Sequence, residues 1–247
     1  MARIQYDNLN RHVLEAVKTL KSNIMFSSVD KPVQSLLLTS CEVGAGKTTT
    51  ATLLGITMAE SGKRTLLVEA DLRRPNLGNT LGLRRETGLC NVLLSEKSME
   101  EVTCKTEYDN LYFVDCGPIP PNPVEMIGSQ QFKHFMELVK QEYDMVIYDM
   151  APVGLFIEPA LVAADVDGVV LVIGQGEVDY RAAQEAKEQL DRAHAKILGV
   201  VLNKVKHKGG SGSYYYDRDY YYYDYYDQQT GEKKHKKKGK LSAAKKK

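Results

Sequence analysis

The fold is decided by residues 36–50, which read Leu-Leu-Leu-Thr-Ser-Cys-Glu-Val-Gly-Ala-Gly-Lys-Thr-Thr-Thr. The apolar run at 36–38 is typical of a buried strand, and the hydroxyl-rich end leads into a helix-like segment at 51–54. Gly44 and Gly46 allow the backbone to turn its amide groups inward without Cβ clashes. A helix that begins directly after such a turn adds free N–H groups and the positive end of its dipole. The order of strand, glycine-rich turn and helix therefore predicts a phosphate-binding loop.

The residues of this loop have separate expected roles. Lys47 is expected to reach the β- and γ-phosphates of a nucleotide, and the Thr48 hydroxyl is expected to ligate Mg²⁺. The strict signature G-x-x-x-x-G-K-[ST] is not met, because Cys41 stands at its first glycine position. A glycine turn without a nucleotide is the alternative, which the strand-to-helix context disfavours. The predicted nucleotide-binding residues of the loop are Val43, Gly44, Ala45, Gly46, Lys47, Thr48 and Thr49.

The bulk properties of the chain limit its class. It has 247 residues and a formal net charge of +1, so its overall charge gives no reason to expect a nucleic-acid partner. Its four cysteines lack a C-x-x-C pair and no signal peptide precedes them, which predicts reduced thiols in a cytoplasmic protein. No apolar run approaches the roughly 20 residues that span a bilayer. We expect a soluble protein that reaches a membrane only through a partner.

A second buried strand ends in charged side chains. Residues 64–75 read Arg-Thr-Leu-Leu-Val-Glu-Ala-Asp-Leu-Arg-Arg-Pro. Glu69 and Asp71 are two residues apart, so their side chains should leave the same face of the strand. The carboxyl ends of parallel strands line the ligand crevice, where two carboxylates can hold a metal or accept a proton. A capping aspartate beside a salt-bridged glutamate is the structural alternative.

Two later strands each deliver one polar residue. Asp149 ends the apolar strand in residues 143–149, downstream of the phosphate loop, which is the Walker B arrangement for Mg²⁺. An aspartate after a strand is otherwise a turn former. Asn203 ends the strand at 197–203 and is expected either to hydrogen-bond an adenine edge or to cap a turn.

The alternation of apolar strands and helices predicts the fold class. Residues 33–206 should form one α/β domain of the P-loop NTPase type, with a doubly wound, mainly parallel sheet and helices on both faces. Residues 1–32 are predicted to form a helical segment, because Leu14, Val17, Leu20 and Ile24 recur at helical spacing. Residues 76–110 show little pattern beyond a short helix near 89–94.

From residue 207 onward the composition changes. A Gly/Ser linker, a segment rich in tyrosine and aspartate, and a lysine-rich end follow one another with few aliphatic residues, which predicts a disordered tail over 207–247. Tyrosine hydroxyls beside acids suit phosphorylation, and self-association of a low-complexity patch is the alternative. The lysine-rich end is expected to keep the tail soluble or to touch anionic lipid. The candidate phosphoacceptors are Tyr214, Tyr215, Tyr216, Tyr220, Tyr221, Tyr222, Tyr223, Tyr225 and Tyr226.

From about residue 15 to residue 226 the chain resembles the bacterial tyrosine kinases that regulate capsule and exopolysaccharide synthesis (BY-kinases), in their short, cytoplasmic Gram-positive form. The matching segments are a Walker A variant (41–48), a Walker A′ strand (66–73), Walker B (146–152), a Pro-Pro-Asn-Pro loop (120–123), Leu-Asn-Lys (202–204) and the tyrosine tail. The N-terminal pattern of Glu15, Lys18 and Lys21 is similar to the family's Glu-x-x-Arg-x-x-Arg oligomerisation motif.

The resemblance implies a kinase that uses ATP and Mg²⁺, releases ADP, and phosphorylates its own C-terminal tyrosines, often in trans within a ring. The catalytic residues that it implies are Lys47, Glu69, Asp71, Arg73 and Asp149, with Glu69 as the base for the tyrosine hydroxyl. The metal contacts that it implies are Thr48, Asp71 and Asp149. The implied partners are the cytoplasmic tail of a membrane activator, a cognate tyrosine phosphatase, and the machinery of polysaccharide polymerisation and export. Through such a partner the chain would be recruited from the cytoplasm to the inner face of the cell membrane.

The chain departs from the family at two places. Glu69 stands where the family has aspartate, and a misplacement of about an ångström at a catalytic group can cost a hundredfold in rate. Lys18 and Lys21 replace arginines and so lose the bidentate fork of the guanidinium.

Two other functions compete with the kinase. A switch ATPase of the MinD and ParA class shares the sheet, but it usually has lysine at the position of Glu42 and lacks a tyrosine tail. The third candidate is a non-catalytic scaffold whose tail binds a membrane or a polymerase.

Overall fold

The computed structural model describes residues 3–6, 9–27 and 31–205, which belong to one compact unit. The predicted tail at 207–247, with all nine candidate tyrosines, lies outside the described residues. Within the described residues, no helix is both long and apolar enough to cross a membrane.

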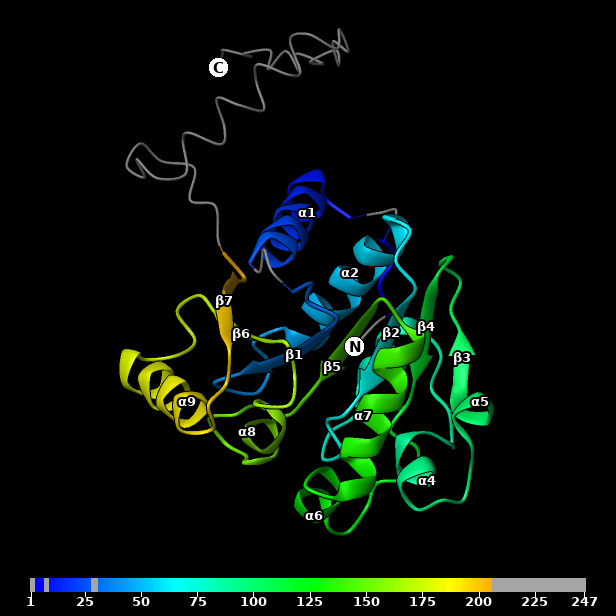
Figure 1. The fold of residues 1–247 in the computed structure, drawn as a ribbon. Coiled ribbons are helices and arrows are strands. Elements are labelled where there is room, and N and C mark those ends of the chain that lie inside the picture. Colours follow the sequence, from blue (N-terminus) through cyan, green and yellow to red (C-terminus); the bar gives the residue numbers. More distant parts are fainter. Residues whose placement is uncertain (1–2, 7–8, 28–30, 206–247) are drawn as a thin grey trace, which may run out of the picture. The chain divides into compact units, whose positions relative to one another are not determined.

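A seven-stranded sheet forms the centre of this unit (Figure 1), in the order β3-β4-β2-β5-β1-β6-β7. The strands are β1 (Ser35–Ser40), β2 (Thr65–Glu69), β3 (Thr103–Lys105), β4 (Leu111–Val114), β5 (Met145–Asp149), β6 (Gly168–Gly174) and β7 (Ile197–Asn203). All neighbours pair in parallel except β3, which runs antiparallel to β4. The predicted doubly wound, mainly parallel sheet is confirmed.

Helices cover both faces of the sheet (Figure 1). The first face carries α1 (Arg11–Phe26), α2 (Lys47–Glu60) and α3 (Leu77–Leu81). The second face carries α4 (Leu89–Leu93), α5 (Met99–Val102), α6 (Pro123–Ile127), α7 (Gln130–Glu142), α8 (Glu158–Val162) and α9 (Tyr180–Arg192). The strands are apolar throughout because successive side chains enter opposite cores: Leu36 and Leu38 pack with the first group of helices and Leu37 with the second.

The sheet register brings the predicted acids to one edge. Glu69 of β2 is the register partner of Asp149 of β5, and Asp149 in turn pairs with Leu38 of β1. The phosphate loop follows β1 directly, so it lies at the same carboxyl edge as both acids. Residues far apart in the sequence are thereby collected around one point.

Two segments differ from the sequence expectation. The N-terminal helix is confined to Arg11–Phe26, and the chain before it packs against α2, with a Tyr6 hydroxyl that donates to Glu60 at 2.9 Å. The poorly patterned stretch at 76–110 folds into α3, α4, α5 and the short edge strand β3. These elements are three to five residues long, so each is too short to show a helical or strand period in the sequence.

Candidate active site

The phosphate loop has the backbone geometry that its glycines predict. Gly44 and Gly46 have φ values of 84° and 94°, in the left-handed region that side chains disfavour. Gly46 precedes the first residue of α2, and a Cβ there would lie 2.0 Å from Nδ2 of Asn203. With glycine at position 46, the side-chain amide of Asn203 donates to the backbone carbonyl of Ala45 at 2.9 Å. Asn203 therefore braces the phosphate loop from β7, and its predicted contact with an adenine stays a prediction.

Lys47 reaches from the start of α2 into the acidic edge of the sheet. Its Nζ lies 3.3 Å from Oδ2 of Asp71, and its side chain is 12% exposed. Burial lowers the pKa of Lys47, but the charges of Asp149, Asp71 and Glu69 outweigh burial and raise the pKa above its ordinary value. The lysine is therefore held as a cation at neutral pH.

Asp149 is buried beside Lys47 and is under-bonded. It is 1% exposed, and neither of its carboxylate oxygens has a hydrogen bond of acceptable geometry among the described residues. Burial raises the pKa of Asp149, while the nearby Lys47 charge and Thr48 hydroxyl oppose that rise. Buried polar atoms are seldom left without partners, so this carboxylate is suited to a ligand that supplies positive charge.

The site fits a magnesium ion that is shared with a phosphate. The described residues contain no group of three or more His, Cys, Asp or Glu side chains able to hold a metal by themselves. Mg²⁺ usually takes one or two carboxylates and completes its shell with water and substrate phosphates. Asp149 and the buried hydroxyl of Thr48 offer that kind of partial shell.

Glu69 is fully buried, and its carboxylate accepts hydrogen bonds from backbone amides. Its Oε2 accepts from the amides of Asn76 and Leu77, both at 2.6 Å, and its Oε1 accepts from the amide of Asp71 at 3.1 Å. Burial and the charge of Asp149 raise the pKa of Glu69, and the amides of Leu77 and Asn76 oppose them. The side chain therefore clamps the loop that follows β2.

Asp71 and Arg73 lie on that clamped loop. Oδ1 of Asp71 accepts from the amides of Arg73 at 3.2 Å and Arg74 at 3.0 Å, which leaves Oδ2 for Lys47. Arg73 donates through Nε to Oε1 of Glu158 at 2.5 Å, and its guanidinium lies 4.4 Å from the ring centroid of Phe156. Glu158 is buried, and its Oε2 has no partner among the described residues.

Sequence reasoning missed Glu158 and Phe156. Both follow Walker B at a distance of several residues, and no spacing in the sequence links them to Arg73, which is 85 residues from Glu158. An acidic residue directly before a proline at the start of a short helix was the available signal.

The remaining predicted residues lie outside this cluster. Glu15 and Lys18 form an ion pair of 3.0 Å on α1, and Lys21 is half-buried one turn later. Val43 is exposed at the tip of the phosphate loop, and Thr49 is half-buried in α2. The oligomerisation role of the α1 residues stays a prediction.

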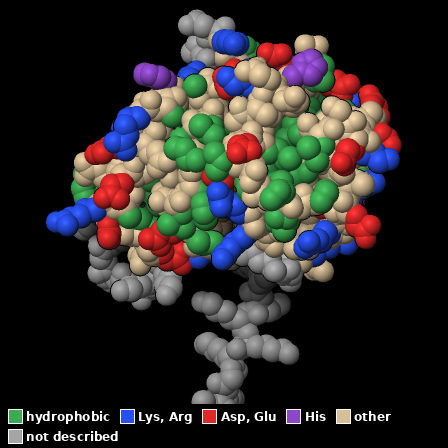
Figure 2. Space-filling model, turned by 90° about the horizontal axis from the view of Figure 1, so that it is seen from below, with side chains coloured by type: hydrophobic (Ala, Val, Ile, Leu, Met, Phe, Trp, Pro, Cys, Tyr) green, Lys and Arg blue, Asp and Glu red, His purple; other side chains and the backbone are tan. Residues whose placement is uncertain are grey.

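The loops after β4 and β5 and the helix α8 expose apolar side chains near this edge. They are Ile119, Leu155 and Ile157 in the loops and Leu161 in α8. Figure 2 views the end of the molecule where α6 and α8 lie in Figure 1, and apolar side chains gather there in patches that charged groups interrupt.

Comparisons with known proteins identify the family. A family model described as AAA domain matches residues 33–193. The tyrosine-protein kinase YwqD of Bacillus subtilis (strain 168) is 38% identical over 192 residues, which cover 78% of this chain and 81% of that protein. The chain belongs to the bacterial tyrosine-protein kinases. Another member, the tyrosine-protein kinase CpsD of Streptococcus agalactiae, is 33% identical over 205 residues, covering 81% of this kinase chain and 89% of its relative.

Solved structures agree with the family. The kinase domain of the Escherichia coli tyrosine kinase ETK matches with a TM-score of 0.78 at 25% identity, covering 87% of this kinase and 86% of that chain. The chimerical protein CapA2B2 matches with a TM-score of 0.75 at 34% identity, covering 77% and 84%. MinD of Pyrococcus horikoshii, complexed with Mg-ADP, has a TM-score of 0.61 at 22% identity over 75% of this kinase and 76% of that chain, which shows a shared fold alone.

Proposed function

We propose that this kinase transfers the γ-phosphoryl group of ATP, with Mg²⁺, to tyrosine hydroxyls of its own C-terminal cluster, in trans within an oligomer. The observation that carries the proposal is the convergence of Lys47, Asp71 and Asp149 at one edge of the sheet, where the Asp149 oxygens lack partners. A cation in this place and a phosphate on the loop would satisfy all three side chains.

The residues divide the work by position. The amides of the phosphate loop and the protonated Lys47 bind and orient the phosphates. Thr48 and Asp149, with Asp71 beside them, would hold Mg²⁺, which supplies positive charge that neutralises the transferring phosphoryl group. Glu158 accepts from Nε of Arg73, and the ring of Phe156 packs against its guanidinium. Arg73, held in this way on the loop after Asp71, would contact an oxygen of the transferring group through its remaining N–H groups.

Two carboxylates are candidates for the proton acceptor. The tyrosine hydroxyl has an ordinary pKa near 10, so its proton must be lost as its oxygen bonds to phosphorus and the bond to ADP breaks. Glu69 is the acceptor that the family resemblance implies, but both its oxygens are bonded to backbone amides. Oδ2 of Asp71 is bonded to Lys47, which phosphates would draw away. We therefore favour Asp71 as the proton acceptor and Glu69 as the residue that positions it.

The cellular setting is part of the proposal. The family points to capsule or exopolysaccharide synthesis, with a membrane activator, a tyrosine phosphatase and the polymerisation and export machinery as partners. We propose a cytoplasmic kinase that an activator recruits to the inner face of the cell membrane. α1, with Glu15, Lys18 and Lys21, is the proposed contact between copies in a ring.

The test is a phosphorylation assay with the full chain. The purified protein is incubated with ATP and Mg²⁺, with and without the cytoplasmic tail of a candidate activator, and residues 214–226 are mapped by mass spectrometry. We expect phosphotyrosine that is absent in a Lys47→Met control.

The other outcomes favour other functions. Release of free phosphate with an unmodified tail would support the switch ATPase. Neither product in the presence of the activator would support the scaffold.

A further inference from the structure

Two arginines beside the active site have no ionic partner. Arg74 and Arg84 are exposed, and within the part of the chain that the structure describes no acidic side chain pairs with either guanidinium. Their neighbours in sequence differ, because Arg73 pairs with Glu158 and the Arg85 side chain contacts the thiol of Cys104. We call Arg74 and Arg84 the arginine rim.

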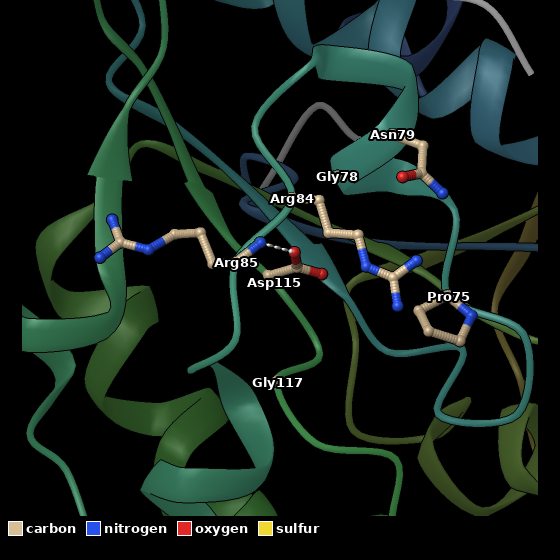
Figure 3. A pocket seen from close by; sticks show the side chains of 7 residues that line it. All are labelled: Pro75, Gly78, Asn79, Arg84, Arg85, Asp115 and Gly117. Atoms are coloured by element: carbon tan, nitrogen blue, oxygen red, sulfur yellow. Dashed lines mark hydrogen bonds between the residues drawn. The ribbon is translucent and has the colours of Figure 1, made fainter.

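A shallow pocket lies beside Arg84 (Figure 3). Its lining includes Pro75, Asn79, Arg84 and Asp115, and the Arg84 side chain extends toward Pro75, the residue that follows Arg74. The Asp115 carboxylate accepts from the backbone amides of Arg85 at 2.7 Å and Cys116 at 2.8 Å. Although Asp115 lines the same pocket, it forms no ion pair with Arg84 among the described residues, so the guanidinium can pair with a partner outside the chain.

The shape of the pocket indicates the kind of partner. Its volume is about 10 Å³, which is room for a single water molecule. A small molecule would find no enclosed site there. An extended acidic segment that lies across the surface could contact both guanidiniums without entering the pocket, and carboxylates and guanidiniums pair with a favourable geometry.

The backbone connects the rim to the reaction centre. Oδ1 of Asp71 accepts from the amide of Arg74, and Oδ2 of the same carboxylate contacts Lys47. Glu69 fixes the following residues through the amides of Asn76 and Leu77. A segment bound at the rim would thus be held a few residues from the proposed site of phosphoryl transfer.

The chain itself contains a segment of matching charge. Residues 214–227 carry four aspartates and one arginine, a formal charge of −3, whereas residues 233–247 are lysine-rich and would be repelled. We propose that the arginine rim binds the acidic tyrosine cluster, residues 214–227, of a second copy of this chain. The rim thereby selects tyrosines flanked by aspartate. The inference rests on the proposed function for the use of that binding, though the binding itself requires no catalysis.

The test compares two labelled peptides by fluorescence anisotropy with the full-length protein. One peptide has the sequence of residues 214–227, and in the other all four aspartates are asparagine. We expect the wild type to bind the aspartate peptide about tenfold more tightly at low salt, because two partly exposed charge pairs contribute roughly that ratio and are screened by salt. The variant Arg74→Gln/Arg84→Gln should bind both peptides equally, and the control Arg181→Gln, an exposed arginine on α9, should keep the preference.

The outcomes separate the rim from the kinase. A preference that survives in the double variant, or no preference in the wild type, overturns the rim. Binding of phosphatidylglycerol vesicles through the two arginines, without a peptide preference, would assign the rim to a lipid surface and also overturn the proposal. If the wild type binds the aspartate peptide through the rim but phosphorylates neither peptide, the proposed function fails and the docking site stands. If the wild type binds both peptides equally and phosphorylates both equally, the docking site fails and the proposed function stands.

Discussion

The carboxylate of Glu69 accepts from the backbone amide of Leu77 across 2.6 Å, at the first residue of α3. The same oxygen also accepts from Asn76, so a single side chain closes the loop that carries Asp71 and Arg73. Aspartate, which the family resemblance places at this position, is shorter by one methylene group. The longer side chain of Glu69 thus reaches amides that an aspartate at the same backbone position would not reach.

The first prediction concerns this clamp. Glu69→Ala should lower the free energy of unfolding by about 1–3 kcal/mol, because it leaves buried amides without an acceptor. Glu69→Asp should keep the charge but speed hydrogen exchange at the amides of Asn76 and Leu77, measured by NMR or mass spectrometry. Unchanged exchange at these two amides in Glu69→Asp would contradict the clamp. Arg181→Gln serves as a variant that should leave the loop untouched.

The second prediction concerns Asp149 and the cation. In the wild type, ATP with Mg²⁺ should raise the melting temperature, with a stabilisation of about 2.7 kcal/mol at a hundredfold excess over Kd. Asp149→Asn should lose the Mg²⁺-dependent part of this rise, because the under-bonded carboxylate is the proposed metal contact. Differential scanning fluorimetry with ATP alone and with ATP plus Mg²⁺ measures the difference. An equal rise in both proteins would remove Asp149 from the metal site.

The third prediction concerns pH. Burial raises the pKa of Asp149 in the folded protein above its ordinary unfolded value, so the folded state binds the proton more tightly. Its contribution to stability is therefore fully present below the unfolded pKa, near 4, and is lost as the pH rises through the folded pKa. The wild type should gain stability relative to Asp149→Asn as the pH falls from neutrality toward 5. Chemical denaturation at a series of pH values tests this, and a difference that is constant with pH would refute it.

The fourth prediction concerns Arg73 and its support. Glu158→Gln removes the charge that holds Nε of Arg73 while keeping the shape of the side chain. We expect kcat for tyrosine phosphorylation to fall by about tenfold, with little change in the melting temperature or in the KM for ATP, since a misplaced catalytic group acts on the transition state. A change confined to KM for ATP would place Arg73 in ground-state nucleotide binding instead.

The fifth prediction concerns the brace between Asn203 and the phosphate loop. Gly46→Ala should be strongly destabilising, because its Cβ would collide with Nδ2 of Asn203 and its φ of 94° is unfavourable for alanine. Adding Asn203→Ala removes the collision but not the backbone strain. Urea denaturation should therefore show that the double variant loses less free energy of unfolding than the two single variants lose in sum. Strict additivity would show that the two residues do not interact.

Much of the fold was predictable from local patterns. The phosphate loop, the Walker B strand and the N-terminal helix each depend on residues that are adjacent or at regular spacing, such as Lys47 after Gly46 or Val17 and Ile24 on one helix face. The alternation of apolar strands with helices was enough to predict a mainly parallel sheet. The antiparallel edge strand β3 was not predicted, because three residues carry no period.

The site was predictable only in part, because its details are long-range. The sequence predicted that Glu69 and Asp71 would share a face, yet Glu69 turns to amides seven and eight residues later and Asp71 turns to Lys47. The ion pair of Arg73 with Glu158 joins two loops that only the folded sheet brings together. Which carboxylate faces a substrate depends on such contacts, and the residue types alone do not determine it.

The pairing of Glu69 with Asp149 in the sheet register affects how long the protein would survive in a cell. Two buried carboxylates on adjacent strands repel each other and lower the stability of the ligand-free fold. A bound cation would offset that repulsion and raise the stability. Copies without bound nucleotide would unfold more often and would be degraded by proteases faster than copies with bound nucleotide. The supply of nucleotide and magnesium would then set the abundance of the kinase as well as its rate.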